Sequence, residues 1–386
     1  MKSVKSTKKP RLSRDAERVI WLTGKLHESF SRIESTWLED EIMALTVKLL
    51  EANDPEMMDV MADRMSEKDP ELFKEFQYLL GAVNQVKTTA EGAYLILAMP
   101  IMAWSRYAIP TPQLSASVLD SLRDLMTRHI LATGSRVIFA NHLLSSNQVP
   151  GDPVSAWQLS KALWQSAEVG QDCPVDLPPD PEEISVFIDI RYVYACAFIP
   201  KGRPVFRWNE LNDGRAQVAT RWQKQAAPLI QTVLPGCTFE VLLPDSLSSA
   251  QSMVIHDFSV FSVVNAVPYL TETYKLPANK FCAVLGLFGD KLREEWRISF
   301  MRIGSNDVLF GVTWHVDPGN EGAEVGTEIE YLLKKAKIGD VIVLDELFSL
   351  LYCHGCGAPL YPNLDGENVH AKLSDEMTHS TAPLLH

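Results

Sequence analysis

The chain has 386 residues, 46% of them hydrophobic, which is enough for two domains of common size that each bury a core. Its formal net charge is -13, so most of the chain repels phosphate backbones and a nucleic-acid role has to rest on a short segment. The longest apolar stretch, 93–104, is interrupted by Pro100 and is too short to cross roughly 30 Å of hydrocarbon. No signal-peptide pattern follows the first charges, so we expect a cytoplasmic protein that does not enter a membrane.

The first residues are strongly basic. Residues 1–14 carry six basic side chains and no acid, namely Lys2, Lys5, Lys8, Lys9, Arg11 and Arg14. We predict a disordered basic tail over residues 1–12. Such a tail can also act as an electrostatic arm for RNA or for an acidic partner.

A helical pattern then continues to residue 169. The first apolar stripe repeats every three or four residues and comprises Val19, Leu22, Leu26, Phe30, Ile33 and Trp37. It predicts one long helix, with Ser13 as the N-cap. Further helical patterns cover 38–49, 56–65, 70–86, 119–130 and 157–163. We therefore expect an all-helical N-terminal domain over residues 13–169.

The composition changes at residues 170–183, where four prolines and five acids predict a linker. Strand patterns follow at 186–199, 238–243, 281–287, 297–303, 308–314 and 341–344, with helical patterns at 215–233 and 324–335. Strands and helices in this order favour an α+β sandwich domain over residues 184–350, with helices on one face of a sheet. The expected fold class is therefore α+β.

The motif Cys-His-Gly-Cys-Gly at 353–357 is the segment that most needs a chemical explanation. Zinc, dithiol redox chemistry and inert thiols are three interpretations of it. A redox Cys-x-x-Cys normally opens a helix, whereas Gly357 and Pro359 prevent a helix here. Two thiolates at this spacing can share one tetrahedral zinc ion, so we predict a zinc-ribbon-like hairpin within residues 351–386.

The other zinc ligands are expected after the turn. Asp365-Gly366 is a hairpin signal, so the chain behind it should return toward the cysteines. His370 is the best third ligand by chemistry, although an ideal two-residue turn places it opposite Tyr361, several residues short of Cys356. That register favours Asp375, Glu376 or His379 instead. The predicted metal set is Cys353, Cys356, His370 and His379.

Other chemical signals are weak. His256-Asp257 suits a metal or acid–base pair, but adjacent helical residues diverge, and a surface pair is the commoner explanation. Asp189 and Arg191 on one strand suit a buried ion pair better than a ligand pocket. The chain has no phosphate-cradling Walker loop, no nucleophile elbow and no dinucleotide fingerprint. No catalytic residue is assigned.

Four segments carry a resemblance to a known family: 11–18, 103–110, 234–237 and the closing turn at 353–362. In these residues the chain resembles the proteobacterial family known as domain of unknown function 2863. The resemblance implies a bacterial, cytoplasmic protein and brings no activity, cofactor or catalytic residue. We expect a non-enzymatic adaptor or regulator with a protein partner and a structural zinc turn. The alternatives are a metal-dependent hydrolase with an interdomain cleft and an RNA- or ribosome-associated protein that binds through the tail.

Overall fold

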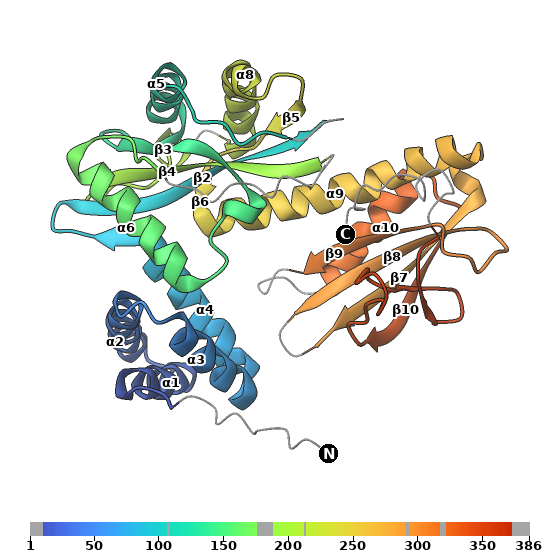
Figure 1. Cartoon of the computed structure of the whole chain (residues 1–386), viewed down its shortest axis with the longest axis horizontal. Coiled ribbons are helices and arrows are strands. Elements are labelled where there is room, and N and C mark those ends of the chain that lie inside the picture. Colours follow the sequence, from blue (N-terminus) through green and yellow to red (C-terminus); the bar gives the residue numbers. More distant parts are fainter. Residues whose placement is uncertain are drawn as a thin grey trace. The chain divides into compact units, whose positions relative to one another are not determined.

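The computed structural model describes residues 11–105, 109–175, 188–211, 214–290, 293–316 and 322–372 (Figure 1). These residues form two compact units, unit 1 up to Gln251 and unit 2 from Ser252 onward. The predicted tail falls almost wholly outside the described residues, as do residues 176–183 of the predicted linker.

Unit 1 begins with four helices: α1 (Arg14–His27), α2 (Arg32–Glu51), α3 (Pro55–Lys68) and α4 (Pro70–Gln85). Each starts at a side chain that accepts a backbone N–H, from Ser13, Ser31, Asp54 and Asp69 in turn. The single long helix predicted from Ser13 is wrong, because the chain leaves α1 after His27 and Ser31 caps a new helix. This break divides the predicted apolar stripe between two helices.

A six-stranded antiparallel sheet follows in unit 1. Its strands are β1 (Val86–Thr88), β2 (Gly92–Trp104), β3 (Arg136–Ser145), β4 (Ile188–Pro200), β5 (Thr238–Val241) and β6 (Asp245–Ser246). They run in the order β1-β2-β4-β3, and β5 and β6 both pair with β2. The expectation of an all-helical domain over 13–169 is therefore wrong. The apolar residues of β2 are buried on both faces of the sheet, so they form a continuous run without the alternation that marks a strand.

The domain boundary also differs from the prediction. β4 pairs along its whole length with β2, so residues 188–251 belong to unit 1, which therefore continues past the predicted linker at 170–183. A proline-rich composition indicates that a segment is neither helix nor strand. It does not indicate whether the strand that follows joins the same sheet as the strands before it.

Helices cover both faces of this sheet (Figure 1). α5 (Ala116–Leu125), which continues into a π-helical turn (Met126–Ile130), and α8 (Arg215–Val233) pack on one face around the fully buried Leu122, Trp222 and Ile230. α6 (Pro153–Val169) packs on the other face, where Trp157, Leu163 and Trp164 are buried. A short helix, α7 (Trp208–Leu211), precedes α8.

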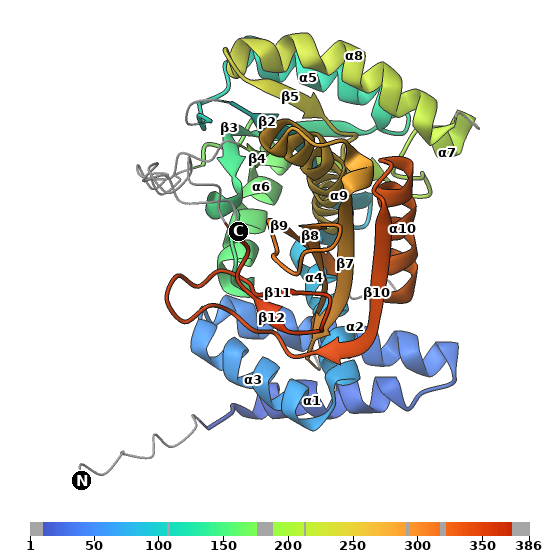
Figure 2. The ribbon, with the colours of Figure 1, turned by 90° about the vertical axis from the view of Figure 1, so that its right-hand side faces the viewer.

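Unit 2 is a four-stranded sheet in the order β10-β7-β8-β9. Its strands are β7 (Phe281–Gly289), β8 (Glu294–Arg302), β9 (Phe310–Val316) and β10 (Asp340–Phe348), and only the pairing of β10 with β7 is parallel. α9 (Leu247–Tyr274) starts in the last residues of unit 1 and continues in unit 2. α9 and α10 (Gly322–Lys335) pack on one face of the sheet (Figure 2). The α+β class predicted from the sequence is confirmed.

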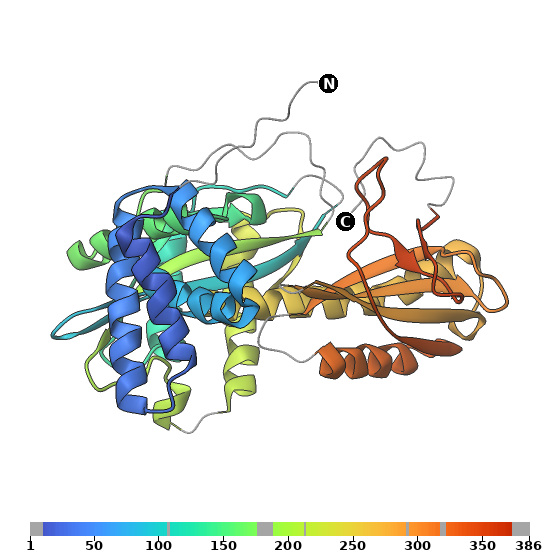
Figure 3. The ribbon, with the colours of Figure 1, turned by 90° about the horizontal axis from the view of Figure 1, so that it is seen from below.

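A hairpin of β11 (Tyr361–Pro362) and β12 (Asn368–Val369) covers the opposite face of the unit 2 sheet (Figure 3). Tyr361 is buried there against Cys282, Val284 and Met301 of β7 and β8. Cys353 and Cys356 of the predicted metal site come before this hairpin in the chain, and His370 comes directly after it.

Among the described helices, α9 is the one long and apolar enough to cross a membrane by length and composition alone. Only 33% of its most apolar window is buried. Val263, Val267 and Leu270 of this helix pack into the core of unit 2.

Candidate metal centre

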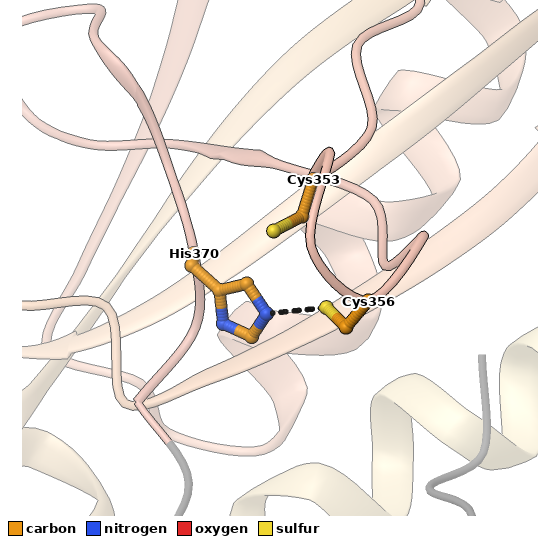
Figure 4. Close-up of side chains that lie close together, drawn as sticks. All are labelled: Cys353, Cys356 and His370. Carbon is orange, nitrogen blue, oxygen red and sulfur yellow. Dashed lines mark hydrogen bonds between the residues drawn. The ribbon is translucent and has the colours of Figure 1, made fainter.

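The cysteine turn is closed by its own backbone. The N–H of Cys353 donates to the carbonyl of Ala358 at 2.7 Å, and the N–H of Gly357 donates to the carbonyl of Cys353 at 2.8 Å. Gly357 has φ +75°, a left-handed conformation that glycine adopts without a steric penalty. The closed turn holds both sulfur atoms on the side that faces His370 (Figure 4).

The hairpin that returns the chain has a longer loop than the predicted two-residue turn. Tyr361 pairs with Val369 and Pro362 with Asn368, so His370 is shifted by one position from the predicted register. The side chain of Asn363 organises the loop, because its Oδ1 accepts the N–H groups of Asp365 and Glu367. Such Asx turns stabilise a compact loop.

The structure brings Cys353, Cys356 and His370 together. The Nε2 atom of His370 lies 3.2 Å from the Sγ atom of Cys356, and all three ligand atoms lie within 4.8 Å of one another. A tetrahedral zinc ion holds sulfur and nitrogen ligands about 3.5 Å apart, so small side-chain rotations suffice to bind one. Register alone placed His370 too far away, because it did not include the backward turn of residues 353–358.

A second contact fixes the orientation of the histidine ring. Nδ1 of His370 lies 2.8 Å from the carbonyl oxygen of Ala371, so this nitrogen carries the proton that it donates. The lone pair of Nε2 then points at the sulfur atoms, which is the arrangement that metal-binding histidines commonly have. Cys353 is partly buried, and Cys356 and His370 are exposed. The predicted fourth ligand, His379, lies outside the described residues, as do Asp375 and Glu376.

A buried arginine holds the base of the turn. Arg297 of β8 is completely buried, and its Nη1 donates to the carbonyls of Leu351 and Leu360 at 2.6 Å each. These two carbonyls flank the cysteine turn on either side. The guanidinium also stacks on Tyr352, with 5.0 Å from its carbon to the ring centre. The sheet of unit 2 therefore anchors both arms of the turn.

Sequence analysis missed this role of Arg297, although a signal was present. Trp296, Ile298 and Phe300 alternate with Arg297 and Ser299 along β8. In a strand this period places the polar pair on the face opposite the apolar residues. Ser299 donates from its Oγ to the carbonyl of Pro362, so both polar residues contact the hairpin.

The charge of Arg297 is balanced by Glu295, which is 3% exposed and accepts from the Nε atom of Arg297 at 2.7 Å. Nδ1 of His315 lies 3.3 Å from the other carboxylate oxygen. Burial alone would raise the pKa of Glu295, but the hydrogen bonds of His315 and Arg297 outweigh it and hold that pKa below its usual value. Glu295 is therefore an ionised carboxylate under the hairpin at neutral pH.

A family model described as protein of unknown function, DUF2863, matches residues 4–384 of the chain. The chain belongs to the DUF2863 family. This membership confirms the resemblance inferred from the four sequence segments. No curated protein and no solved structure is detectably similar to the chain.

Two further predicted candidates have structural explanations in this DUF2863 chain. His256 on α9 lies 3.1 Å from Glu328 of α10 and 3.5 Å from Asp257, at the surface of unit 2. Burial would lower the pKa of His256, but the two carboxylates outweigh it and raise that pKa. Arg191 is buried, pairs with Asp189 and donates to the carbonyls of residues 109 and 110, so the pair holds the loop after β2.

Proposed function

We propose that this chain is a non-enzymatic interaction protein of the bacterial cytoplasm, an adaptor or regulator, in which a structural zinc ion stabilises the segment from residue 351 onward, with the cysteine turn and the β11–β12 hairpin. The convergence of Cys353, Cys356 and His370 within 4.8 Å supports the metal. Two thiolates and one imidazole form a donor set that zinc prefers. His379 is the proposed fourth ligand.

The small size of the hairpin supports a structural role for the ion. β11 and β12 have two residues each, and a two-stranded hairpin of this size is marginal in water. In this segment Ala358, Pro359, Tyr361, Pro362 and Asn363 are buried, whereas residues 354–357 of the cysteine turn are exposed. Binding of zinc to ligands on both sides of the hairpin would supply folding free energy that its apolar contacts do not.

The interaction role is supported by exposed apolar side chains at the start of unit 1. We define the α1–α2 surface by Trp21, Phe30, Ile33 and Trp37, which are 49%, 102%, 86% and 50% exposed. Four large apolar side chains are exposed within 17 positions of one helix pair, and three of them, Trp21, Phe30 and Trp37, line one groove. Exposed apolar patches commonly mark protein–protein contacts. Two of them are tryptophans, which are common among the residues that dominate binding energy.

Metal analysis of the purified protein tests the zinc site. We expect about one zinc per chain, because one set of ligands converges among the residues that the structure describes. Cys353→Ser and His370→Ala should each remove most of the metal. His354→Ala is the matched control: His354 lies exposed inside the same turn, outside the cluster, and its loss should leave the zinc content unchanged. Well-folded wild-type protein without zinc would contradict the proposal.

A metal-dependent hydrolase is the first alternative, because catalytic zinc sites have three protein ligands and one open position, and three ligands converge here. Loss of zinc from His379→Ala would favour the structural site. Full zinc retention in that variant, together with hydrolysis of model esters or peptides by the wild type, would favour the hydrolase.

RNA association is the second alternative, supported by the six basic residues within 1–14. Binding through such a tail should weaken steeply as salt increases, because phosphate contacts release counterions. RNA binding that survives deletion of residues 1–12 and does not respond to salt would contradict this role for the tail.

A further inference from the structure

We propose that unit 1 contains a binding pocket for an uncharged planar heterocycle, a nucleobase or a nucleoside. The pocket is a cavity of about 280 Å³ that is lined by residues of α4, α6, β2, β4 and the start of α9. Pockets for small molecules usually measure roughly 300–1,000 Å³, so this one suits a small ligand. The inference goes beyond the proposed interaction role and does not depend on it, because the lining residues belong to unit 1 and the zinc ligands to unit 2.

Two buried polar groups of the pocket lack a hydrogen-bond partner. Asn84 of α4 is 9% exposed and Tyr194 of β4 is 1% exposed, and both residues line the pocket. The Oδ1 atom of Asn84 and the hydroxyl of Tyr194 make no hydrogen bond with any described residue. A buried polar atom without a partner lowers the stability of the fold. A ligand with N–H groups at its edge would supply the missing partners.

A glutamine shows that the Tyr194 hydroxyl lies at the pocket. Burial raises the pKa of Tyr194, and the side chain of Gln251 lies close enough to offset part of that rise, without a hydrogen bond between the two. Gln251 lines the same pocket, as does Gln77 of α4. The amides of Asn84, Gln77 and Gln251 each carry a donor beside an acceptor. This pair matches the edge of a nucleobase, which asparagine and glutamine bind through two hydrogen bonds.

The charge of the lining disfavours an anionic ligand. No lysine, arginine or histidine occurs among the described residues that line the pocket, and Asp152 is the charged residue there. The N-terminus of α6 could attract an anion, but the carboxylate of Asp152 already accepts the N–H groups of Val154 and Ser155. A phosphate group would meet a negative charge and no positive partner. The ligand is therefore a base or a nucleoside rather than a nucleotide.

The apolar walls and one glycine leave room for a flat ring. Leu80, Ile96 and Leu163 are buried and line the pocket, as apolar side chains do in most small-molecule sites. Gly81 of α4 also lines it, although glycine inside a helix is less favourable than alanine. A Cβ atom at Gly81 would lie 3.5 Å from the Nε2 atom of Gln85, which is an ordinary contact. Crowding therefore does not explain this glycine, whereas space for a ligand does.

Isothermal titration calorimetry of the full chain tests the proposal. The probes are adenosine, guanosine, cytidine and uridine, their free bases and their 5′-monophosphates. We expect at least one nucleoside or base to bind, and the corresponding monophosphate to bind about tenfold more weakly or worse, because it carries the phosphate charge.

Tyr194→Phe should raise the dissociation constant of that ligand by about tenfold, because one hydrogen bond is lost. The hydroxyl has no partner among the described residues, so the variant should fold as stably as the wild type. Tyr192→Phe is the matched control, because Tyr192 is a buried tyrosine of the same strand that does not line the pocket. This control should leave the dissociation constant unchanged.

Gly81→Leu should fill the pocket and abolish measurable binding. Gly24→Leu is its control, because Gly24 is a glycine of α1 outside the pocket, where a Cβ atom would lie 3.7 Å from Nζ of Lys68. The zinc content of all these variants should equal that of the wild type. A failure of the pocket and a failure of the zinc site can therefore be told apart.

A wild type that binds none of the nucleosides and bases would overturn the proposal, as would binding that Gly81→Leu leaves intact. A monophosphate that binds as tightly as its nucleoside would contradict an uncharged ligand. Glucose is a further probe: binding of glucose without binding of any nucleoside or base would replace the heterocycle by a sugar and so overturn the ligand class.

Discussion

Arg297 connects strand β8 with both sides of the cysteine turn, which lie 54 and 63 residues later in the sequence. Its side chain reaches Glu295 on its own strand and the carbonyls of Leu351 and Leu360 on either side of the cysteine turn. Because the guanidinium is fully buried, each unmade hydrogen bond would leave a charged donor without water or partner. The Nη2 atom has no hydrogen-bond partner among the described residues and lies 2.7 Å from Glu295, so the carboxylate of Glu295 supplies the charge that balances it.

Glu295→Gln tests this network. We expect the variant to be less stable than the wild type by about 3 kcal/mol at pH 7, because Arg297 loses its buried counter-charge. The folded-state pKa of Glu295 is depressed, so its contribution is present above the unfolded-state value of about 4.3 and is lost as pH falls through the folded value. The difference between the two proteins should narrow below about pH 4.

Urea unfolding of both proteins between pH 7 and pH 3.5 measures this effect. Glu330→Gln is a suitable control, since Glu330 forms a surface pair with Lys334 on α10, and surface pairs contribute little. A stability difference for Glu295→Gln that stays constant over this pH range would contradict the role of the ionised carboxylate.

At the scale of the element, the hairpin β11–β12 depends on a glycine in the sheet below it. A Cβ atom on Gly311 of β9 would lie 2.4 Å from the ring of Tyr361. The ring of Tyr361 is itself mostly buried, and burial raises the pKa of its hydroxyl. Because Gly311 has no side chain, the ring of Tyr361 packs directly on β9. A larger residue at position 311 would push the hairpin away from the sheet.

Gly311→Ala should lift the hairpin. We expect a loss of stability of about 1–3 kcal/mol, as for overpacked cores, and a weaker affinity for zinc, because both arms of the cysteine turn move. Gly151→Ala is the control, since a Cβ atom at Gly151 would have no neighbour within 4 Å. Thermal unfolding and zinc competition with a chromogenic chelator give the two quantities. Unchanged zinc affinity in Gly311→Ala would show that the site does not depend on the sheet.

Elements with a clear period could be predicted from the sequence. The pattern at 215–233 matches α8 and the pattern at 70–86 matches α4. β2 and β3 could not be recognised, because strands buried on both faces lose their alternation and resemble buried helices. The break between α1 and α2 was hidden because Phe30 and Ile33 continue the apolar period although they are exposed. An apolar period along a helix does not show whether its side chains are buried within the chain or exposed on its surface.

The candidate site was predictable in its chemistry and less so in its geometry. Cys353, Cys356 and His370 were identified from residue type, and the structure brings them together. Their proximity depends on the backward turn of 353–358 and on the five-residue loop at 363–367, and neither follows from a hairpin signal alone. Arg297 supports the site from a different part of the chain, so local patterns do not reveal it.

Over the whole molecule the six cysteines fall into two classes. Cys173, Cys196, Cys237 and Cys282 are buried, whereas Cys353 is partly buried and Cys356 is exposed. Burial raises the pKa of the Cys173 and Cys282 thiols, and raises that of Cys196 to about 12. Because the thiolate is the reactive form, the buried class should be inert in the folded protein.

Titration with a thiol reagent measures how many cysteines belong to the accessible class. In native protein treated with a chelator we expect two reactive thiols, and in denaturant all six cysteines should react. Zinc-loaded native protein should react slowly, because coordination protects both sulfur atoms. The variant Cys353→Ser should show one reactive thiol. More than two reactive thiols in folded, chelated protein would mean that the buried class is accessible.

The hairpin that packs on β7 and β8 also determines when unit 2 can complete its folding during protein synthesis. β8 leaves the ribosome well before residues 351–362. Arg297 can therefore form its hydrogen bonds to the carbonyls of Leu351 and Leu360 only after those residues have been synthesised. Until then Val284 and Met301, which the hairpin covers, remain open to solvent. Nascent chains that stall before Tyr361 should therefore be aggregation-prone and readily degraded by quality-control proteases.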